Sequence, residues 1–209
     1  MSLPGKFIAF EGGEGAGKST QASLLAETLR ARGRDVLVTR EPGGTPGAEA
    51  IRKLLLDTAG DGFLPRAEAL LFAAARADHV ERLIRPALEA GHWVLCDRYL
   101  DSSRAYQGGG GGLADDDLLA LHRLGSGGLL PDLTLLIEVS PEEAAKRIAH
   151  RDGEEADRIG GRPAEYHARV AAAFRSFAEA EPARFAVIDG NVPREITQAA
   201  ILAALDRLA

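Results

Sequence analysis

A glycine-rich segment near the N-terminus has the residue types and spacing of a phosphate-binding loop. Residues 12–19 read GGEGAGKS and fit the pattern G-x-x-x-x-G-K-[ST]. Glycines let successive backbone N–H groups turn toward an anion, and the N-terminus of a following helix adds partial positive charge. In such a loop Lys18 reaches the β- and γ-phosphates of a nucleotide, and the Ser19 hydroxyl binds Mg²⁺. The residues expected to hold the nucleotide are Gly12, Gly13, Glu14, Gly15, Ala16, Gly17, Lys18, Ser19 and Thr20.

The flanking sequence supports this interpretation. Lys6–Phe10 is a short apolar run typical of a strand, and Leu24, Leu25 and Leu29 share one face of a helix that Gly33 stops. The motif requires a preceding strand and a following helix, so a glycine-rich turn with an incidental Lys-Ser is the weaker alternative.

A phosphate loop alone does not identify a reaction, because GTPases, ATPase motors and small-molecule kinases share it. A GTPase usually reads guanine with N-K-x-D, but Asn191 is the only asparagine and Val192-Pro193 follow it. A Ras-like switch is therefore disfavoured.

Glu14 is unusual inside the loop, since a carboxylate beside phosphates is costly unless it faces away or meets a donor. It is either a solvated loop residue or a ligand for a hydroxyl of a second substrate.

A second charged pair ends a later apolar strand. The carboxylate of Asp97 after Val94–Cys96 points into the ligand crevice of an open α/β sheet. There it could hold Mg²⁺ through water or position an attacking group, and Arg98 could neutralise a phosphate. The alternative is a buried Asp–Arg pair with a structural role. Arg40–Gly44 ends another strand and forms a further loop at the ligand edge.

Two short stretches carry groups that could recognise a nucleobase. Phe72 and Arg76 lie at i and i+4, so a ring and a guanidinium could stack on a base and donate to its carbonyl. A helical Phe is more often a core residue. Ser103, Tyr106 and Gln107 also share a face and offer hydroxyl and amide groups, although such a face is often merely polar.

Several arginines cluster around a glycine-flanked segment. Arg147 and Arg151 precede it, and Arg158 and Arg162 follow near Gly160-Gly161. Phosphoryl transfer needs positive charge on the transferring group and exclusion of water, which a closing lid supplies. Four acidic residues lie between the arginines, so a solvated, charge-balanced loop is the alternative.

The overall composition narrows the class of protein. At 209 residues, 45% hydrophobic and 27% charged, the chain is a globular protein of one domain, neither disordered, collagen-like nor a coiled coil. The net charge of −6 disfavours nucleic acid or an anionic membrane as the main partner. A single cysteine, Cys96, fits a reducing cytoplasm. We find no signal-peptide pattern, no zinc spacing and no apolar run of the ~18 residues that a membrane span needs.

Strand and helix patterns alternate along the chain, which predicts a parallel sheet with helices on both faces. The helix that Pro65 opens carries Ala67, Leu70, Leu71 and Ala74 at core spacing. The expected strands are Lys6–Phe10, Asp35–Thr39, Trp93–Cys96, Leu133–Val139 and Ala186–Ile188. The other expected helices are Ala48–Leu56, Pro141–His150, Ala164–Ala180 and Pro193–Leu208.

Together these motifs resemble those of bacterial thymidylate kinases, which convert dTMP to dTDP with ATP in dTTP biosynthesis. The resemblance runs in family order over nearly the whole chain. It is carried by residues 10–20 (FEGGEGAGKST), 39–44 (TREPGG), 71–76 (LFAAAR), 97–99 (DRY), 105–110 (AYQGGG), 131–135 (PDLTL) and 157–159 (DRI).

The resemblance implies a three-layer P-loop kinase fold, α/β, with a sheet of about five parallel strands. It implies a single domain over residues 1–209, a short lid at about 147–163, a cytoplasmic homodimer, and ATP with Mg²⁺. Because Gly15 and Ala16 leave the phosphate loop without an arginine, the lid would supply that charge through Arg147, Arg151 or Arg158.

The resemblance also assigns the acceptor site. It implies that Phe72 stacks on thymine and that Arg76 donates to its O4, with Ser103 and Gln107 near the base edge. Tyr106 would fill the space beside C2′ and disfavour a ribose. The remaining implied contacts are Glu14 with the sugar 3′-hydroxyl, Arg98 with the acceptor phosphate, Arg40 with the substrate, and Asp97 with Mg²⁺.

Two positions depart from the family pattern. Gly160 stands where a Glu often follows D-R-I, and Gly111 stands where an Arg is common after the glycine run.

The sequence leaves two other functions open. One is a kinase for a different nucleoside monophosphate or a deoxynucleoside, and the other is a non-catalytic nucleotide-binding regulator.

Overall fold

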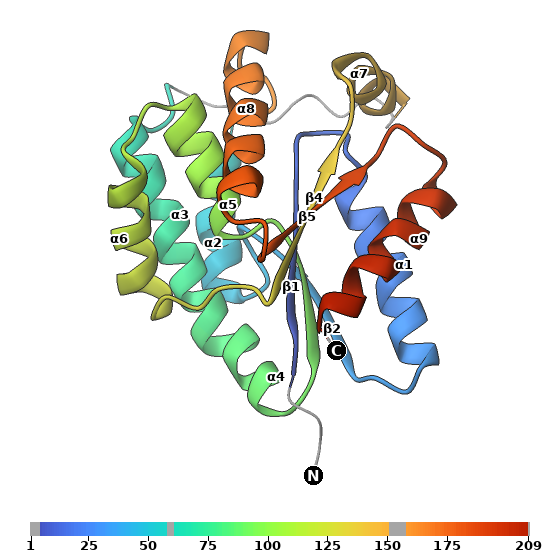
Figure 1. Cartoon of the computed structure of the whole chain (residues 1–209). Coiled ribbons are helices and arrows are strands. Elements are labelled where there is room, and N and C mark those ends of the chain that lie inside the picture. The colour runs from blue at the N-terminus through green and yellow to red at the C-terminus, as the bar shows by residue number, and fades with distance from the viewer. Residues whose placement is uncertain (1–4, 58–60, 151–157, 209) are drawn as a thin grey trace.

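The fold is an α/β arrangement of three layers (Figure 1). The computed structural model describes residues 5–57, 61–150 and 158–208, apart from the side chain of residue 150. Five parallel strands form one sheet in the order β2-β3-β1-β4-β5, which confirms the predicted fold class. The strands are β1 (Phe7–Glu11), β2 (Val36–Arg40), β3 (Trp93–Asp97), β4 (Leu133–Glu138) and β5 (Phe185–Asp189).

Central strand β1 is buried on both faces because successive side chains point to opposite sides of the sheet. Ile8 and Phe10 enter a core with Leu25 of α1 (Lys18–Ala31) and Ile201 of α9 (Arg194–Ala204). Phe7 and Ala9 enter a second core on the other face. Figure 1 shows α1 and α9 on one side of the sheet and most other helices opposite.

Two of the helices on the opposite face of the sheet continue into π-helical segments. α3 (Pro65–His79) continues into a π-helix, η1 (Val80–Ile84), and α5 (Leu100–Ser103) continues into another, η2 (Arg104–Gly110). Such π segments occur often at functional sites. The remaining helices are α2 (Pro46–Leu56), α4 (Arg85–Glu89), α6 (Asp115–Ser126), α7 (Pro141–His150) and α8 (Ala164–Ala180), with a 3₁₀ turn, η3 (Leu205–Leu208), at the end.

Helix α2 begins earlier than its apolar pattern predicts, at Pro46 rather than Ala48. The Thr45 hydroxyl accepts a hydrogen bond from the Ala48 amide at 3.3 Å, and Pro46 occupies the first turn, where its missing N–H costs nothing. The sequence patterns do not predict α6 at all. Its buried residues are Leu118, His122 and Ser126, so it lacks an apolar stripe.

The expected apolar face of α3 is wrong. Ala67, Leu70 and Ala74 are exposed, Leu70 by 56%, and Leu71 is half-buried. The buried face of the helix instead carries Glu68, Ala69, Ala75, Arg76 and His79. This inward face is polar because it forms one wall of the site described below, and its charges are paired there.

The phosphate loop lies at the carboxyl edge of the sheet, between β1 and α1. Parallel register places Phe10 opposite Asp97, and the amide of Arg98 donates to the Phe10 carbonyl at 2.9 Å. Gly12 has φ of 135°, a conformation that L side chains rarely adopt. A Cβ at this position would lie 2.3 Å from the carbonyl oxygen of Ile137 on β4.

The loop geometry predicts opposite outcomes for two neighbouring glycines. Gly12→Ala should lower the free energy of unfolding by about 1–3 kcal/mol, because the added Cβ clashes with the Ile137 carbonyl and the backbone φ is strained for alanine. Gly13→Ala is the matched control, since a Cβ there meets nothing within 4 Å, and it should stay within about 1 kcal/mol of the parent. Urea unfolding of the three proteins measures this. Equal losses for both variants would contradict the packing described here.

Candidate active site

A cavity of about 500 Å³ opens at the carboxyl edge of the sheet. It brings together residues from the phosphate loop, the ends of β2 and β3, and the inward faces of α3 and η2. The sequence-predicted residues that line it are Glu14, Gly15, Gly17, Lys18, Ser19, Thr20, Arg40, Phe72, Arg76, Asp97, Arg98, Ser103, Tyr106, Gln107 and Arg147.

At one end of the cavity Lys18 lies folded over the phosphate loop. Its Nζ donates to the carbonyl oxygens of Gly12 at 3.2 Å and Gly13 at 2.7 Å. Burial, assisted by the positive charge of Arg98, lowers the pKa of Lys18 from 10.5 to about 8. A buried cation held by neutral carbonyls at a glycine-rich loop is suited to an anionic ligand such as a phosphate chain.

Ser19 and Asp97, the two residues expected to bind Mg²⁺, lie in contact with each other. The Ser19 hydroxyl donates a short hydrogen bond to Oδ2 of Asp97, so the two oxygen ligands lie side by side at the loop. Within the described residues no group of three His, Cys, Asp or Glu could hold a metal ion. One hydroxyl and one carboxylate nevertheless fit Mg²⁺, which commonly takes one or two protein oxygens and completes its shell with water and substrate phosphates.

Arg98 reaches from the end of β3 across the loop. Its φ of 70° makes it the only described non-glycine residue in the left-handed region. The guanidinium donates to the Gly12 carbonyl at 3.1 Å and to Glu14 Oε1 at 2.5 Å, and it lies 4.9 Å from the centroid of the Tyr106 ring. The cation is therefore fixed between the phosphate loop and the far side of the cavity.

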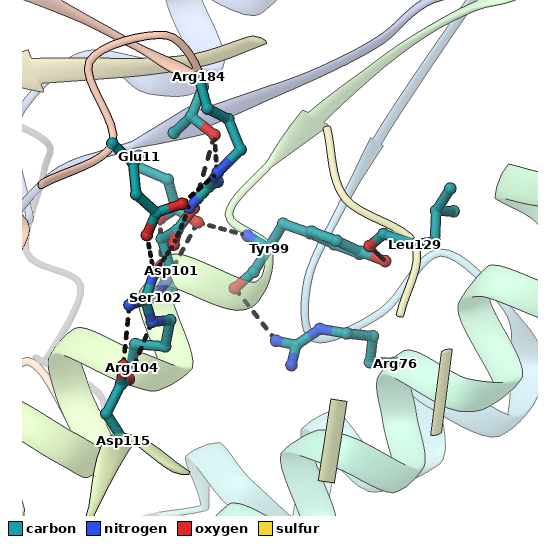
Figure 2. Close-up of polar contacts among 11 residues, drawn as sticks. Glu11, Arg76, Tyr99, Asp101, Ser102, Arg104, Asp115, Leu129 and Arg184 are labelled. Carbon is teal, nitrogen blue, oxygen red and sulfur yellow. Dashed lines mark hydrogen bonds and ion pairs between the residues drawn. The ribbon is translucent and has the colours of Figure 1, made fainter. Parts of the chain in front are cut away.

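The strained turn around Arg98 is held by Glu11, at the end of β1. Its Oε1 accepts from the amides of Tyr99 at 2.8 Å and Ser102 at 3.1 Å, and its Oε2 accepts from the Ser102 hydroxyl at 2.6 Å (Figure 2). Glu11 is fully buried. This burial, with a smaller contribution from nearby Asp101, raises the pKa of Glu11 from 4.5 to about 7.

Below this turn, a buried carboxylate fixes helix α5 to the rest of the fold. Asp101 accepts from Arg184 at 2.6 Å and 3.0 Å and from Arg104 at 3.0 Å (Figure 2). Arg104 also donates to both oxygens of Asp115 on α6 at 2.8 Å. These contacts join α5, α6 and the start of β5, so the turn that carries Arg98 has a rigid base.

The far end of the cavity is built around Arg76 of α3. Arg76 is 4% exposed and donates to Glu41 Oε2 at 2.7 Å, to the Tyr99 carbonyl at 3.1 Å and to the Ser103 hydroxyl at 2.9 Å. Glu41 also lies 3.0 Å from Nδ1 of His79. Phe72, one turn before Arg76, is half-buried and lines the cavity. A guanidinium and an accessible ring therefore lie side by side, as base recognition requires.

Tyr106 and Gln107 extend this wall along η2. The Tyr106 hydroxyl is buried and has no hydrogen-bond partner among the described residues, and burial raises the pKa of Tyr106 to about 12. Gln107 is 2% exposed and donates through Nε2 to Glu68 Oε1 at 2.9 Å. Both residues line the cavity.

The arginines expected in the lid have different locations. Arg147 lines the cavity and donates to the carbonyls of Gly190 at 2.7 Å and Gly15 at 3.5 Å. Arg158 donates to the Asp57 carbonyl at 2.6 Å and is not among the described residues that line the cavity. Arg151 lies outside the described residues.

Comparison with known proteins identifies the family. The thymidylate kinase family model matches residues 10–201. A thymidylate kinase of Rhizorhabdus wittichii is 57% identical over 207 residues, covering 99% of this chain and 100% of that protein. One of Caulobacter vibrioides is 49% identical, covering 94% of each. The crystal structure of thymidylate kinase from Ehrlichia chaffeensis matches with a TM-score of 0.79 and 32% identity, covering 97% of this chain and 100% of that one.

The chain belongs to the thymidylate kinase family. This confirms the resemblance inferred from the sequence motifs. The two departures from the family's motifs lie beside the cavity rather than in it. A Cβ at Gly111 would lie 2.6 Å from the Gln107 carbonyl, and the Gly160 carbonyl lies 3.2 Å from Nε2 of His167.

Sequence reasoning missed the carboxylates that position this thymidylate kinase site. Glu11, Glu41 and Glu68 accept hydrogen bonds from a backbone turn, an arginine and an amide respectively, and the partners of Glu41 and Glu68 lie 35 and 39 positions away. The available signal was weak. Glu11 and Glu41 end or follow strands at the ligand edge, and Glu68 lies one helical turn before Phe72. The other lining residues missed are Pro42, Arg52, Leu56, Tyr99, Ser102 and Ile159.

The lowered pKa of Lys18 predicts proton uptake when a nucleotide binds. At about pH 8 close to half of the Lys18 side chains are neutral in the free protein, and phosphate oxygens favour the charged form. Binding of ATP, the expected nucleotide, should therefore take up about half a proton. Calorimetry in two buffers with different ionisation enthalpies measures it. Lys18→Arg, which stays charged, is the control. Equal proton uptake by both proteins would contradict the assignment.

The raised pKa of Glu11 predicts a specific pH dependence of stability. Between about pH 4.5 and 7 the folded protein holds a proton on Glu11 that the unfolded chain has released. The free energy of unfolding therefore falls as pH rises through this window, by roughly 1–3 kcal/mol from this group. Glu11→Gln removes the titration.

Urea unfolding at pH 5 and pH 8 tests this prediction. The stability of Glu11→Gln relative to the parent should increase from the lower to the higher pH, whereas exposed Glu27→Gln should show no such change. A constant difference between Glu11→Gln and the parent would show that Glu11 does not titrate in this range.

Proposed function

We propose that this protein transfers the γ-phosphoryl group of ATP to dTMP, giving ADP and dTDP, a step of dTTP biosynthesis. Family membership supports the reaction class, a nucleoside monophosphate kinase. The observation that carries the proposal is a single cavity with Lys18, Ser19 and Asp97 at one end and Phe72 with Arg76 at the other. One end suits a phosphate chain with Mg²⁺, and the other suits a pyrimidine base.

The chain's own residues would catalyse the transfer by alignment and charge stabilisation. The phosphate loop and Lys18 hold the donor phosphates, and Arg98 neutralises the phosphate of the acceptor. Mg²⁺, held by Ser19 and Asp97, would further neutralise charge on the donor phosphates. Because Arg98 is already fixed by Gly12 and Glu14, little reorganisation is needed when the acceptor arrives.

The acceptor would lie with its base toward α3 and η2. Phe72 stacks on the thymine ring, and Arg76 donates to O4 from a guanidinium already oriented by Glu41 and Ser103. The buried ring of Tyr106 fills the space beside the sugar, which disfavours a ribose 2′-hydroxyl. Glu14 would meet the 3′-hydroxyl, and Arg40, which also lines the cavity, would contact the substrate.

We further propose that residues 1–209 form one domain in which residues 147–163 serve as a lid. Arg147 is supported as the cation on the donor side, since it lines the cavity and contacts the phosphate loop at Gly15. Arg151 is proposed from the sequence alone. Arg158 would act only after leaving its present contact with Asp57.

We propose a homodimer, and exposed apolar residues of α3 and α6 are candidates for its interface. Leu70 is 56% exposed and Leu124 is 87% exposed, and these two helices pack against each other. We propose a cytoplasmic enzyme without a nucleic-acid partner, in keeping with the net charge of −6. Among the described residues no helix is long and apolar enough to span a bilayer.

A coupled assay of ADP formation tests the proposed reaction. With ATP and Mg²⁺, dTMP should be the preferred acceptor over dUMP, dGMP and UMP. Lys18→Ala should lower turnover about 100-fold or more through loss of charge stabilisation. The matched control Lys53→Ala removes an exposed lysine of α2 and should leave turnover unchanged.

Two results would overturn this function. A clear preference for a purine monophosphate would point to a different nucleoside monophosphate kinase. Nucleotide binding without ADP formation, whichever monophosphate is supplied, would point to a non-catalytic regulator.

A further inference from the structure

Glu68 is a buried acid that the proposed reaction does not use. It lies on α3 and is 3% exposed. Its Oε1 accepts from Gln107 Nε2 at 2.9 Å, and its Oε2 accepts from Arg162 at 2.5 Å. A buried ion pair contributes little net stability compared with apolar residues of the same volume. A carboxylate at this position therefore requires another explanation than stability.

The position of Glu68 relates it to the base end of the cavity. Glu68, Phe72 and Arg76 are spaced at i, i+4 and i+8 and so share one face of α3. Two polar contacts join this face to the opposite wall. Arg76 donates a hydrogen bond to Ser103, and Glu68 accepts one from Gln107. Gln107 lies four residues after Ser103, whereas Glu68 lies eight residues before Arg76. Phe72, the ring expected beneath the base, lies between the two contacts in the helix.

The contact with Glu68 fixes which atom of Gln107 faces the cavity. A carboxylate only accepts hydrogen bonds, so the Gln107 atom next to Glu68 must be the amide nitrogen. The Gln107 oxygen has no hydrogen-bond donor among the described residues, and Gln107 lines the cavity. The carboxamide therefore presents an acceptor to a ligand rather than a donor.

We infer that Glu68 is a positioning residue for base recognition, which orients the Gln107 carboxamide so that its oxygen accepts the N3–H of thymine. This inference rests on the proposed function. Thymine has one ring N–H, at N3, so an acceptor facing its edge must serve that group, directly or through one water. Cytosine carries a lone pair at N3 and would meet the Gln107 oxygen with repulsion.

Arg162 holds Glu68 in this orientation. It donates to Glu68 through one terminal nitrogen and to the Tyr166 hydroxyl through the other at 2.5 Å, and Tyr166 in turn donates to the Tyr106 carbonyl at 2.7 Å. The carboxylate is thus fixed from both sides, by Gln107 on η2 and by Arg162 just before α8. Its side chain cannot rotate away without leaving a buried charge unpaired.

Glu68→Gln tests the inference because a glutamine at this position can accept or donate, so the Gln107 amide loses its fixed orientation. The dTMP-to-dCMP ratio of kcat/KM should fall about tenfold, the scale of one mismatched buried hydrogen bond. The dTMP-to-dUMP ratio should not change, since dUMP keeps the N3–H. General loosening of the pocket would change both ratios. Exposed Glu165→Gln is the matched control and should change neither.

Two further variants make the test decisive. Glu68→Asp keeps the charge for Arg162 but is one methylene too short for Gln107, so it should reproduce the tenfold loss even if Glu68→Gln does not fold. In a Gln107→Leu background Glu68→Gln should change the dTMP-to-dCMP ratio no further, because it acts through Gln107.

The outcomes separate this inference from the proposed function. Failure of the parent protein to phosphorylate dTMP would overturn the proposed function. A parent that prefers dTMP over dCMP, together with Glu68 variants that keep the same preference, would overturn the role of Glu68 alone. Additive effects of Glu68→Gln and Gln107→Leu would also overturn it.

Discussion

The site depends on carboxylates that hold arginine side chains in fixed orientations. Glu41 holds Arg76 at 2.7 Å, and Glu14 holds Arg98 at 2.5 Å. Removing one partner of the buried Glu41–Arg76 pair costs roughly 3–5 kcal/mol, because it leaves a charge without compensation. The Glu14–Arg98 pair contributes less, since the Glu14 side chain is 36% exposed and water screens its charge. Both arginines line the cavity while they make these contacts.

This constraint explains features that local sequence does not. Arg98 has a left-handed backbone that only a well-braced turn sustains, and Glu11 supplies the brace through three hydrogen bonds. Helix α3 turns a polar face inward and leaves Leu70 exposed, because the inward face forms a wall of the site. Stability and site geometry are thus linked through the same contacts.

Much of the fold and part of the site could be predicted from the sequence, for physical reasons that differ between elements. The strands were recognisable because a buried parallel sheet requires short apolar runs, and the phosphate loop because its glycines and Lys18 carry their chemistry within eight residues. Gln107 and Phe72 were identified as candidates from spacing along a helix. Their proximity to Lys18 across one cavity depends on the strand order, which no local pattern encodes.

The buried acids could not be predicted in the same way. Glu41 meets Arg76 across 35 positions, and Glu11 meets Ser102 across 91. From the sequence alone, a single Glu at the end of a strand is indistinguishable from a solvated loop residue, because its distant partner is not known. Hydrophobic periodicity also failed for α3, because it assumes an apolar interior and this helix faces a polar site. Sequence patterns therefore predict residues that line the cavity better than they predict the buried acids that contact those residues.

A crystal structure with dTMP and ADP bound would show directly whether one cavity orients both substrates through fixed arginines. We expect the thymine ring against Phe72, its O4 at Arg76 and the acceptor phosphate at Arg98, with the ion pairs of Glu41 and Glu14 unchanged. A base bound elsewhere, or substrate phosphates that displace Arg98 from Glu14 into a new rotamer, would contradict it.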